Sequence, residues 1–144
     1  MKISILLPLK ENFSPSYAGA VSLFINDTLK SSKFRKNITV FGHTNYKKRF
    51  SQRYFNIDIK KKIFSSQNKE YVKKFIEIEK KKVSQIIELH NRPIYLKYLV
   101  NDLKKRDYIL YFHNDPLTMS GSKSIKERSF LLDNCYRIVF NSNW

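Results

Sequence analysis

The chain has 144 residues, of which 42% are hydrophobic and 15% aromatic, and its formal net charge is +16. This length is typical of one domain with a substantial core, and the apolar content excludes a disordered chain. No apolar run approaches the roughly eighteen residues of a membrane-spanning helix, and the stretch 3–9, broken by Pro8, is too short for a secretory signal. The single cysteine, Cys135, excludes an internal disulfide. We therefore expect a cytoplasmic globular domain with Cys135 packed in its core.

Positive charge is concentrated in residues 45–82, which contain thirteen Lys or Arg against four Asp or Glu, a net charge of +9. The densest runs are Lys60–Lys62 and Lys80–Lys82. Such an excess favours an anionic partner: nucleic acid, acidic lipid headgroups or a phosphorylated substrate. A solvated, lysine-rich surface with no binding role explains the same composition equally well.

The first half of the chain is predicted to alternate strands with helices. Residues 2–7 form an apolar run typical of a strand. After a polar loop, Val21, Ile25 and Leu29 recur at helical spacing and predict a helix over 18–31. The next predicted elements are a strand at 37–42, a weak strand at 54–59, and a helix with a heavily charged outer face around 72–83.

The second half contains three apolar strands that each lead into polar residues. The strands cover 84–90, 107–113 and 136–142. Between them we expect a helix opened by Pro93, because proline is tolerated in a first turn, and a helix at 122–134. The polar clusters are His90-Asn91-Arg92-Pro93, His113-Asn114-Asp115-Pro116 and Asn141-Ser142.

This alternation predicts an α/β fold, a Rossmann-like three-layer sandwich with a mostly parallel sheet. Continuous apolar strands fit a sheet that is covered on both faces. Ligands of such sheets bind outside the carboxyl ends of the strands, where the polar clusters fall. We therefore expect the functional site at this edge.

Three histidines, His43, His90 and His113, each end a predicted strand. Their spacing matches no compact metal motif and no His-Glu-x-x-His pattern is present, so we expect no metal. A histidine at the carboxyl end of a strand is better suited to hydrogen-bond a hydroxyl-rich or phosphorylated ligand.

Other polar residues near these strand ends allow both a structural and a functional interpretation. Glu88 interrupts an apolar strand, so it must pair with Arg92 or a backbone group, or accept a hydrogen bond from a sugar hydroxyl. The Arg92 guanidinium suits phosphate or carboxylate, although capping is an equally ordinary role. Asn91 and Asn114 can bind ligand or satisfy loop backbone.

The turn after the first strand contains small residues. Ala18, Gly19 and Ala20 would let backbone N–H groups approach an anion at a helix N-terminus. The turn is neither a GxGxxG dinucleotide fingerprint nor a Walker A loop. It predicts either a phosphate contact or an ordinary structural turn.

Four segments together resemble the N-terminal domain of family 4 glycosyltransferases, which have the GT-B fold. The Glu-Leu-His-Asn-Arg-Pro stretch is the most specific, and the four segments cover nearly the whole chain in the same order. They are Tyr17–Val21, Ile87–Pro93, Phe112–Pro116 and Val139–Trp144.

The resemblance implies a retaining hexosyltransferase that takes a nucleotide sugar as donor and needs no metal or other cofactor. Its acceptor would be a cell-envelope glycan or glycolipid, as in lipopolysaccharide or polysaccharide biosynthesis. His113 would be the catalytic residue beside the reacting sugar, and the turn Ala18–Ala20 would approach the donor diphosphate. The acceptor side would be formed by Glu88, His90, Asn91, Arg92 and Asn114.

Members of the family also carry a C-terminal domain that binds the nucleotide sugar. Residues 1–144 correspond to the N-terminal domain alone, which we expect to be incomplete at its C-terminal end. We therefore expect the isolated chain to be inactive, either as a fragment or as one half that needs a separate C-terminal half. The basic segment would suit peripheral binding to the anionic inner face of the cytoplasmic membrane. The alternatives are, in this order, a nucleic-acid-binding domain that uses Tyr46, Phe50, Tyr54 and Phe55, and a non-catalytic interaction half of a split transferase.

Overall fold

The computed structural model of the chain describes residues 1–59 and 66–141. Six strands form one sheet in the order β3-β2-β1-β4-β5-β6, and every neighbouring pair is parallel. The predicted alternation is confirmed, and the sheet is entirely rather than mostly parallel. The strands are β1 (Ile3–Leu6), β2 (Ile38–Gly42), β3 (Tyr54–Asn56), β4 (Ile86–His90), β5 (Asp107–Phe112) and β6 (Arg137–Phe140).

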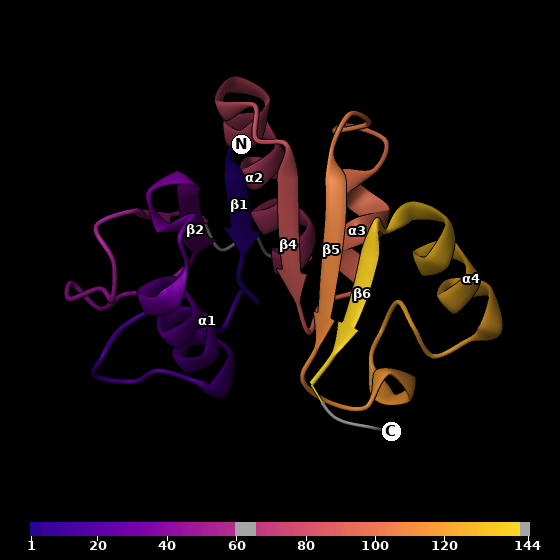
Figure 1. The fold of residues 1–144 in the computed structure, drawn as a ribbon. Helices are drawn as coiled ribbons and strands as arrows, with labels where there is room; N and C mark the ends of the chain where they lie inside the picture. The colour runs from indigo at the N-terminus through magenta and orange to yellow at the C-terminus, as the bar shows by residue number, and fades with distance from the viewer. Residues whose placement is uncertain (60–65, 142–144) are drawn as a thin grey trace.

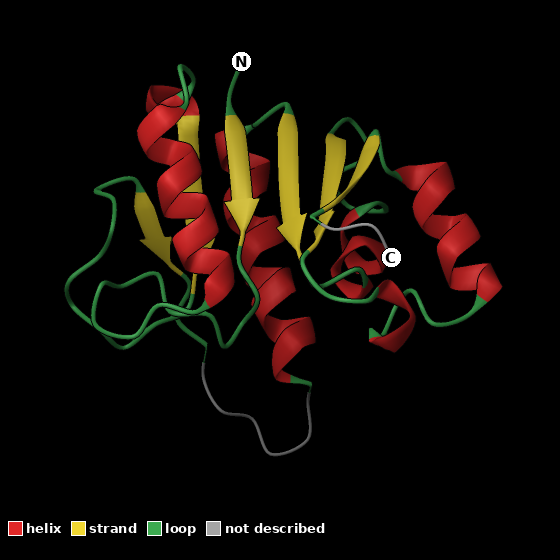
Figure 2. Cartoon of the chain, turned by 60° about the horizontal axis from the view of Figure 1, so that its bottom comes forward, coloured by secondary structure: helices red, strands yellow, loops and turns green. Residues whose placement is uncertain are grey.

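Helices on both faces of the sheet make the expected Rossmann-like three-layer sandwich (Figure 1). Helix α1 (Ala20–Ser31) lies on one face, whereas α2 (Gln67–Lys82) and α3 (Ile94–Leu99) lie on the other (Figure 2). Helix α4 (Ile125–Asn134) joins α2 and α3 on their side, through Leu131. Within the residues that the structure describes, none of the helices is long and apolar enough to cross a membrane.

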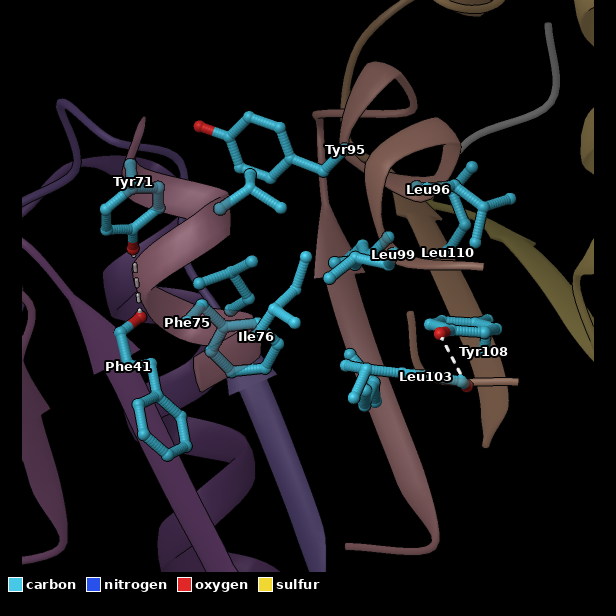
Figure 3. Packing of buried hydrophobic residues seen from close by; sticks show 14 of the residues in the cluster. Phe41, Tyr71, Phe75, Ile76, Tyr95, Leu96, Leu99, Leu103, Tyr108 and Leu110 are labelled. Carbon is cyan, nitrogen blue, oxygen red and sulfur yellow. Dashed lines mark hydrogen bonds between the residues drawn. The ribbon is translucent and has the colours of Figure 1, made fainter. Parts of the chain in front are cut away.

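Consecutive strand residues point to opposite faces, so the sheet builds two cores. The larger core lies between the sheet and α2 and α3 (Figure 3). Its buried tyrosines keep their hydroxyl groups hydrogen-bonded: Tyr71 donates to the Leu7 carbonyl at 3.1 Å, and Tyr108 donates to the Leu103 carbonyl at 3.0 Å. The smaller core lies under α1 and contains Ile3, Ile5, Leu7, Phe13, Val21, Ile25, Ile38 and Val40.

Two local signals fix the loop that follows β5. Gly121 has a φ of +97°, and a Cβ there would lie 2.5 Å from the backbone nitrogen of Ile94. Only glycine allows the loop to lie against the start of α3. The loop then ends in a capping box, in which Ser124 Oγ accepts from the Glu127 N–H and the Glu127 carboxylate accepts from the Ser124 N–H.

The sheet is covered unevenly, which differs from the expectation of two fully covered faces. Ile109, Tyr111 and Val139 point to the α1 side and are only half-buried. Of the helices in residues 1–59 and 66–141, none runs along β5 and β6 on this side (Figure 1), and α1 reaches only the end of β5, where Phe24 contacts the Tyr111 ring at 6.0 Å. The carboxyl ends of these two strands are therefore accessible from the α1 side.

Candidate functional site

The carboxyl ends of the strands meet at one edge of the sheet because all strands are parallel. The strand order reverses between β1 and β4, since the chain leaves β1 for α1 on one face and leaves β4 for α3 on the other. Such a reversal opens a crevice outside the strand ends where α/β proteins bind ligands. Here it holds a cavity of about 610 Å³, and Lys10, Asn68, Asn91, Arg92 and Thr118 are among the residues that line it.

A pair of histidines lies at the same edge, on the α1 side of the sheet. His90 is the last residue of β4 and His113 directly follows β5. Nδ1 of His90 lies 2.9 Å from Nε2 of His113. Nδ2 of Asn141, which follows β6, lies 2.6 Å from Nδ1 of His113. Three neighbouring strand ends therefore contribute one hydrogen-bonded series of side chains, which we call the histidine network.

The direction of these hydrogen bonds defines the tautomer of both imidazoles. With the Asn141 amide as donor, Nδ1 of His113 accepts and Nε2 of His113 carries the proton. That proton is donated to Nδ1 of His90, so the proton of His90 is on Nε2. This buried N–H has no hydrogen-bond partner in the described part of the chain and lies 3.8 Å from Oε2 of Glu88. Both imidazoles are neutral in this arrangement, and the network ends at a carboxylate.

Packing holds the two imidazoles in place. Tyr111 stacks on the His90 ring, with centroids 4.6 Å apart and planes 5° from parallel. Phe24 of α1 meets the His113 ring edge-on at 5.0 Å. Asn91 adopts the left-handed conformation (φ 51°), which asparagine tolerates, and its Oδ1 accepts from the backbone N–H of His113 at 2.8 Å. The positions of both rings are thus fixed by groups from β4, β5 and α1.

The surroundings of His113 and Tyr111 favour the uncharged forms of both side chains. Burial, and then the neighbouring His90, lower the pKa of His113 from 6.5 to about 4. An imidazole with this pKa is neutral at pH 7, in agreement with the tautomers above. Burial, followed by the Glu88 carboxylate, raises the pKa of Tyr111, so this phenol also stays uncharged.

The structure divides the predicted acceptor residues between the two sides of the sheet edge. Glu88 lies with the histidine network, with its Oε2 3.8 Å from Nε2 of His90, and makes no ion pair with Arg92 among the described residues. Arg92 lines the cavity on the α2 side, where its Nη1 donates to the Asn91 carbonyl at 2.7 Å. Asn91 belongs to both sides, because it lines the cavity and also holds the loop after β5. Asn114 is exposed, with its Oδ1 3.4 Å from Nδ2 of Asn91.

The turn with Ala18, Gly19 and Ala20 begins α1 and lies at the carboxyl end of β1. An internal anion occupies this helix N-terminus: Oε1 of Glu11 accepts from the backbone N–H of Ser22 at 2.9 Å. A Cβ on Gly19 would collide with the Glu11 carboxylate, so glycine allows this close approach. A ligand phosphate would have to replace the carboxylate, and the phosphate contact of this turn stays a prediction.

Three residues of the site were given no role from the sequence: Asn141, Phe24 and Glu11. Asn141 follows β6, and the recurrence that indicates His90 and His113 placed it in the polar cluster Asn141-Ser142 at this edge, without a specific role. Phe24 and Glu11 carry no comparable local signal. They reach the site only because α1 and the loop after β1 pack over the strand ends.

The aromatic residues of the basic segment are largely used inside the fold. Phe50 and Tyr54 contact the Phe13 ring at 5.3 and 5.6 Å and pack against the smaller core. Phe55 stays 43% exposed. The basic run Lys60–Lys62 lies outside the described residues.

Neither a metal site nor a reactive thiol is found among the described residues. In residues 1–59 and 66–141, no three His, Cys, Asp or Glu side chains are grouped closely enough to hold a metal ion. Cys135 packs against the larger core as predicted, and burial raises the pKa of its thiol to about 12. A thiol with this pKa is a poor nucleophile at neutral pH.

Comparison with known proteins gives no assignment. No protein-family model matches the chain, and neither a curated protein nor a solved structure matches it at the significance required. The class that the structure itself defines is a Rossmann-like α/β domain with polar groups gathered at the carboxyl edge of its sheet.

Proposed function

We propose that the chain is the acceptor-binding half of a retaining glycosyltransferase that uses a nucleotide sugar. The observation that carries the proposal is the hydrogen-bonded pair of His90 and His113 at the strand ends, on the α1 side of the sheet edge whose α2 side holds the cavity. Neutral imidazole and amide groups suit a hydroxyl-rich ligand, because they exchange hydrogen bonds with it without burying a charge. The size of the cavity, about 610 Å³, is in the range of small-molecule sites.

In this proposal Nδ1 of His113 meets the sugar. This nitrogen accepts from the Asn141 amide, and Asn141 is exposed. A sugar hydroxyl that displaces the amide donates to the same lone pair, so the hydrogen bond from His113 to His90 keeps its direction. The exchange costs little free energy because the released amide can bind water or another hydroxyl of the ligand.

The chemistry needs no protein nucleophile. The acceptor oxygen forms its bond to the anomeric carbon while the bond between that carbon and the leaving phosphate oxygen breaks. The phosphate takes the acceptor's proton on the same face, which retains the configuration. The protein contributes by positioning and by electrostatic stabilisation.

The remaining parts of the proposal concern the partners. A second half holds the nucleotide sugar, and Arg92 and Lys10 in the cavity orient a polar acceptor. A glycolipid acceptor would bring the chain to the inner face of the cytoplasmic membrane. There the net charge of +16 favours contact with anionic lipid.

NMR titrations with the methyl glycosides of glucose, galactose and N-acetylglucosamine test this proposal. We expect at least one glycoside to shift the signals of the His90 and His113 rings. His113→Ala should weaken that binding at least about tenfold, the equivalent of one hydrogen bond to the ligand. Asn141→Ala should retain it, because the ligand replaces this amide.

His43→Ala is the matched control. His43 also follows a strand, but its Nδ1 is bound to the Ile57 carbonyl at 2.9 Å on the β2 side of the sheet. Its removal should leave glycoside binding unchanged. If His113→Ala binds as tightly as the wild type, or if no glycoside binds at the strand ends, the proposal is wrong.

A further inference from the structure

A second pocket lies at the opposite edge of the sheet, where the strands begin. It is a hollow of about 430 Å³, and no acidic residue is among those that line it. Its cations come from segments far apart in the sequence. They are Lys2 before β1, Lys36 before β2, Arg53 before β3, and Lys81 and Lys82 at the end of α2.

The five cations of this amino-edge pocket have no acidic partner within 1–59 and 66–141. The Lys and Arg ion pairs found there join Lys30 to Asp27, Lys80 to Asp102 and Arg106 to Glu79. Like charges gathered in one hollow repel each other, which costs free energy unless an anion or solvent compensates them. The arrangement therefore favours an anion from outside the chain.

Lys82, at the end of α2, makes a side-chain hydrogen bond within the pocket. Its Nζ donates to Oγ1 of Thr39 at 3.1 Å. Burial lowers the pKa of Lys82, Glu79 raises it, and the neighbouring cations Arg53 and Lys2 lower it. The ammonium group is thus partly dehydrated, and it is repelled by Arg53 and Lys2. An anion bound in the pocket would offset both the loss of hydration and the repulsion.

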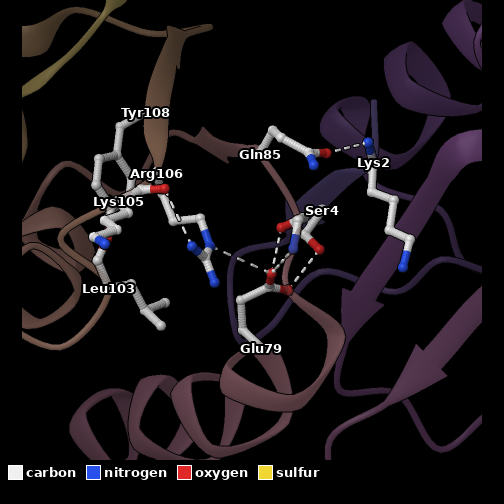
Figure 4. A network of polar contacts seen from close by, with 9 residues as sticks. Lys2, Ser4, Glu79, Gln85, Leu103, Lys105, Arg106 and Tyr108 are labelled. Atoms are coloured by element: carbon white, nitrogen blue, oxygen red, sulfur yellow. Dashed lines mark hydrogen bonds and ion pairs between the residues drawn. The ribbon is translucent and has the colours of Figure 1, made fainter.

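The nearest buried carboxylate, that of Glu79, already has hydrogen-bond and ion-pair partners. Its Oε2 accepts from Ser4 Oγ at 2.7 Å, its Oε1 accepts from the Ser84 N–H at 2.7 Å, and Arg106 Nε lies 3.9 Å from Oε1. Figure 4 shows this cluster. Glu79 also raises the pKa of Lys82, but its single charge is shared with Arg106, so the five pocket cations exceed the one nearby carboxylate.

We propose that the amino-edge pocket binds the phosphate groups of a multiply phosphorylated ligand. Lysine and arginine form charge-assisted hydrogen bonds with phosphate oxygens, and Thr39 and Asn37 add neutral donors to the lining. A hollow bounded by four segments favours a compact phosphorylated group over an extended polymer. The same chemistry exists in a soluble polyphosphorylated molecule and in a phosphorylated lipid headgroup. The inference does not depend on the proposed function, because the histidine network lies at the other edge.

Isothermal titration calorimetry with tripolyphosphate and with inositol hexakisphosphate tests the pocket. The test variant is Arg53→Gln/Lys81→Gln, which removes two exposed cations whose side chains make no hydrogen bond in the described structure. The control is Lys69→Gln/Lys73→Gln, which has the same net charge as the test variant. It alters two exposed lysines of α2 that lie outside the pocket. Circular dichroism verifies that both variants fold.

We expect saturable binding to the wild type. The affinity should fall at least about tenfold in the pocket variant and less than about twofold in the control variant, since screened charges outside the pocket contribute little. Vesicles that contain a phosphoinositide separate the two sources. Vesicle binding lost only in the pocket variant supports a lipid headgroup, and tripolyphosphate binding without vesicle binding supports a soluble ligand. The proposal is overturned if no probe binds or if both variants lose affinity equally. The proposal is also overturned if a single-stranded oligonucleotide binds more tightly than tripolyphosphate and if the two variants weaken oligonucleotide binding equally.

Discussion

The candidate site depends most on one residue, His113, whose backbone and ring are held independently. Its N–H donates to Asn91, its ring donates to His90, and Phe24 packs against its edge. These contacts leave Nδ1, the atom bound by the exposed Asn141 amide, as the acceptor that a ligand can reach. A histidine fixed in this tautomer can accept a hydrogen bond but cannot act as a charged donor.

We expect His113 to titrate near pH 4 in the folded protein. Its pKa there is about 4, against an ordinary value of 6.5, so between these values the unfolded chain binds more protons than the folded chain. The stability of the fold should therefore decrease as the pH falls from 6.5 towards 4, and the contribution of His113 should be constant above 6.5. The ring Cε1–H signal, followed by NMR, measures the midpoint directly.

Urea unfolding at several pH values provides the second measurement. The loss of stability below pH 6.5 should be smaller in His113→Gln, which has no imidazole to protonate in the unfolded chain. A midpoint near 6.5 for His113 would show a solvated ring and contradict the neutral network.

At the scale of elements, a buried carboxylate fastens α2 to the amino edge of the sheet. Glu79 is fully buried near the end of α2. Its partners come from β1, from the turn before β4, and from Arg106, the residue before β5 (Figure 4). Val83 then adopts a left-handed conformation (φ 55°) and turns the chain back into the sheet. The register of α2 against three strands therefore depends on one side chain.

Glu79→Ala should lower the free energy of unfolding by about 3–5 kcal/mol, because it leaves the buried Arg106 guanidinium without an acid. Ser4→Ala removes a single hydrogen bond and should cost about 1 kcal/mol. Urea denaturation followed by circular dichroism measures both values. Glu77→Ala is the control, since Glu77 is exposed on the same helix and its loss should cost less than about 0.5 kcal/mol. Equal costs for Glu79→Ala and Glu77→Ala would contradict the role of the buried carboxylate.

At the scale of the whole molecule, the two edges of the sheet differ in character. The carboxyl edge carries neutral histidines and amides near a cavity with two cations in its lining, Lys10 and Arg92, whereas five cations line the pocket at the amino edge. The net charge of +16 also acts on the fold as a whole, because repulsion between like charges destabilises a compact chain.

The melting temperature should therefore rise with NaCl, since added salt shortens the screening length from about 10 Å at 0.1 M to about 3 Å at 1 M. Low millimolar tripolyphosphate should raise it further at matched ionic strength, because a ligand of the folded state alone stabilises that state. Differential scanning fluorimetry measures both effects. Arg53→Gln/Lys81→Gln should retain the response to NaCl and lose the additional response to tripolyphosphate. A melting temperature that falls with NaCl would contradict the repulsion.

The sequence by itself determined the architecture and the edge of the sheet at which the candidate site lies. Apolar runs and helical stripes are local patterns, and their alternation along the chain predicts an α/β fold with a parallel sheet. Because all parallel strands end at one edge, His90 and His113 could be assigned to that edge before any coordinates were known. The same reasoning covers Asn141, which follows the third of these strands.

Only the tertiary structure decided which of these side chains meet. Strand order and register determine the face and the neighbours of each residue, and neither is encoded locally. Thus Arg92 and Glu88 lie on opposite sides of the sheet edge. Glu11 caps helix α1 by accepting from the N–H of Ser22, a residue eleven positions later in the chain. The amino-edge pocket draws only part of its charge from the basic stretch 45–82, because Lys2 and Lys36 join it when the strand beginnings are brought side by side.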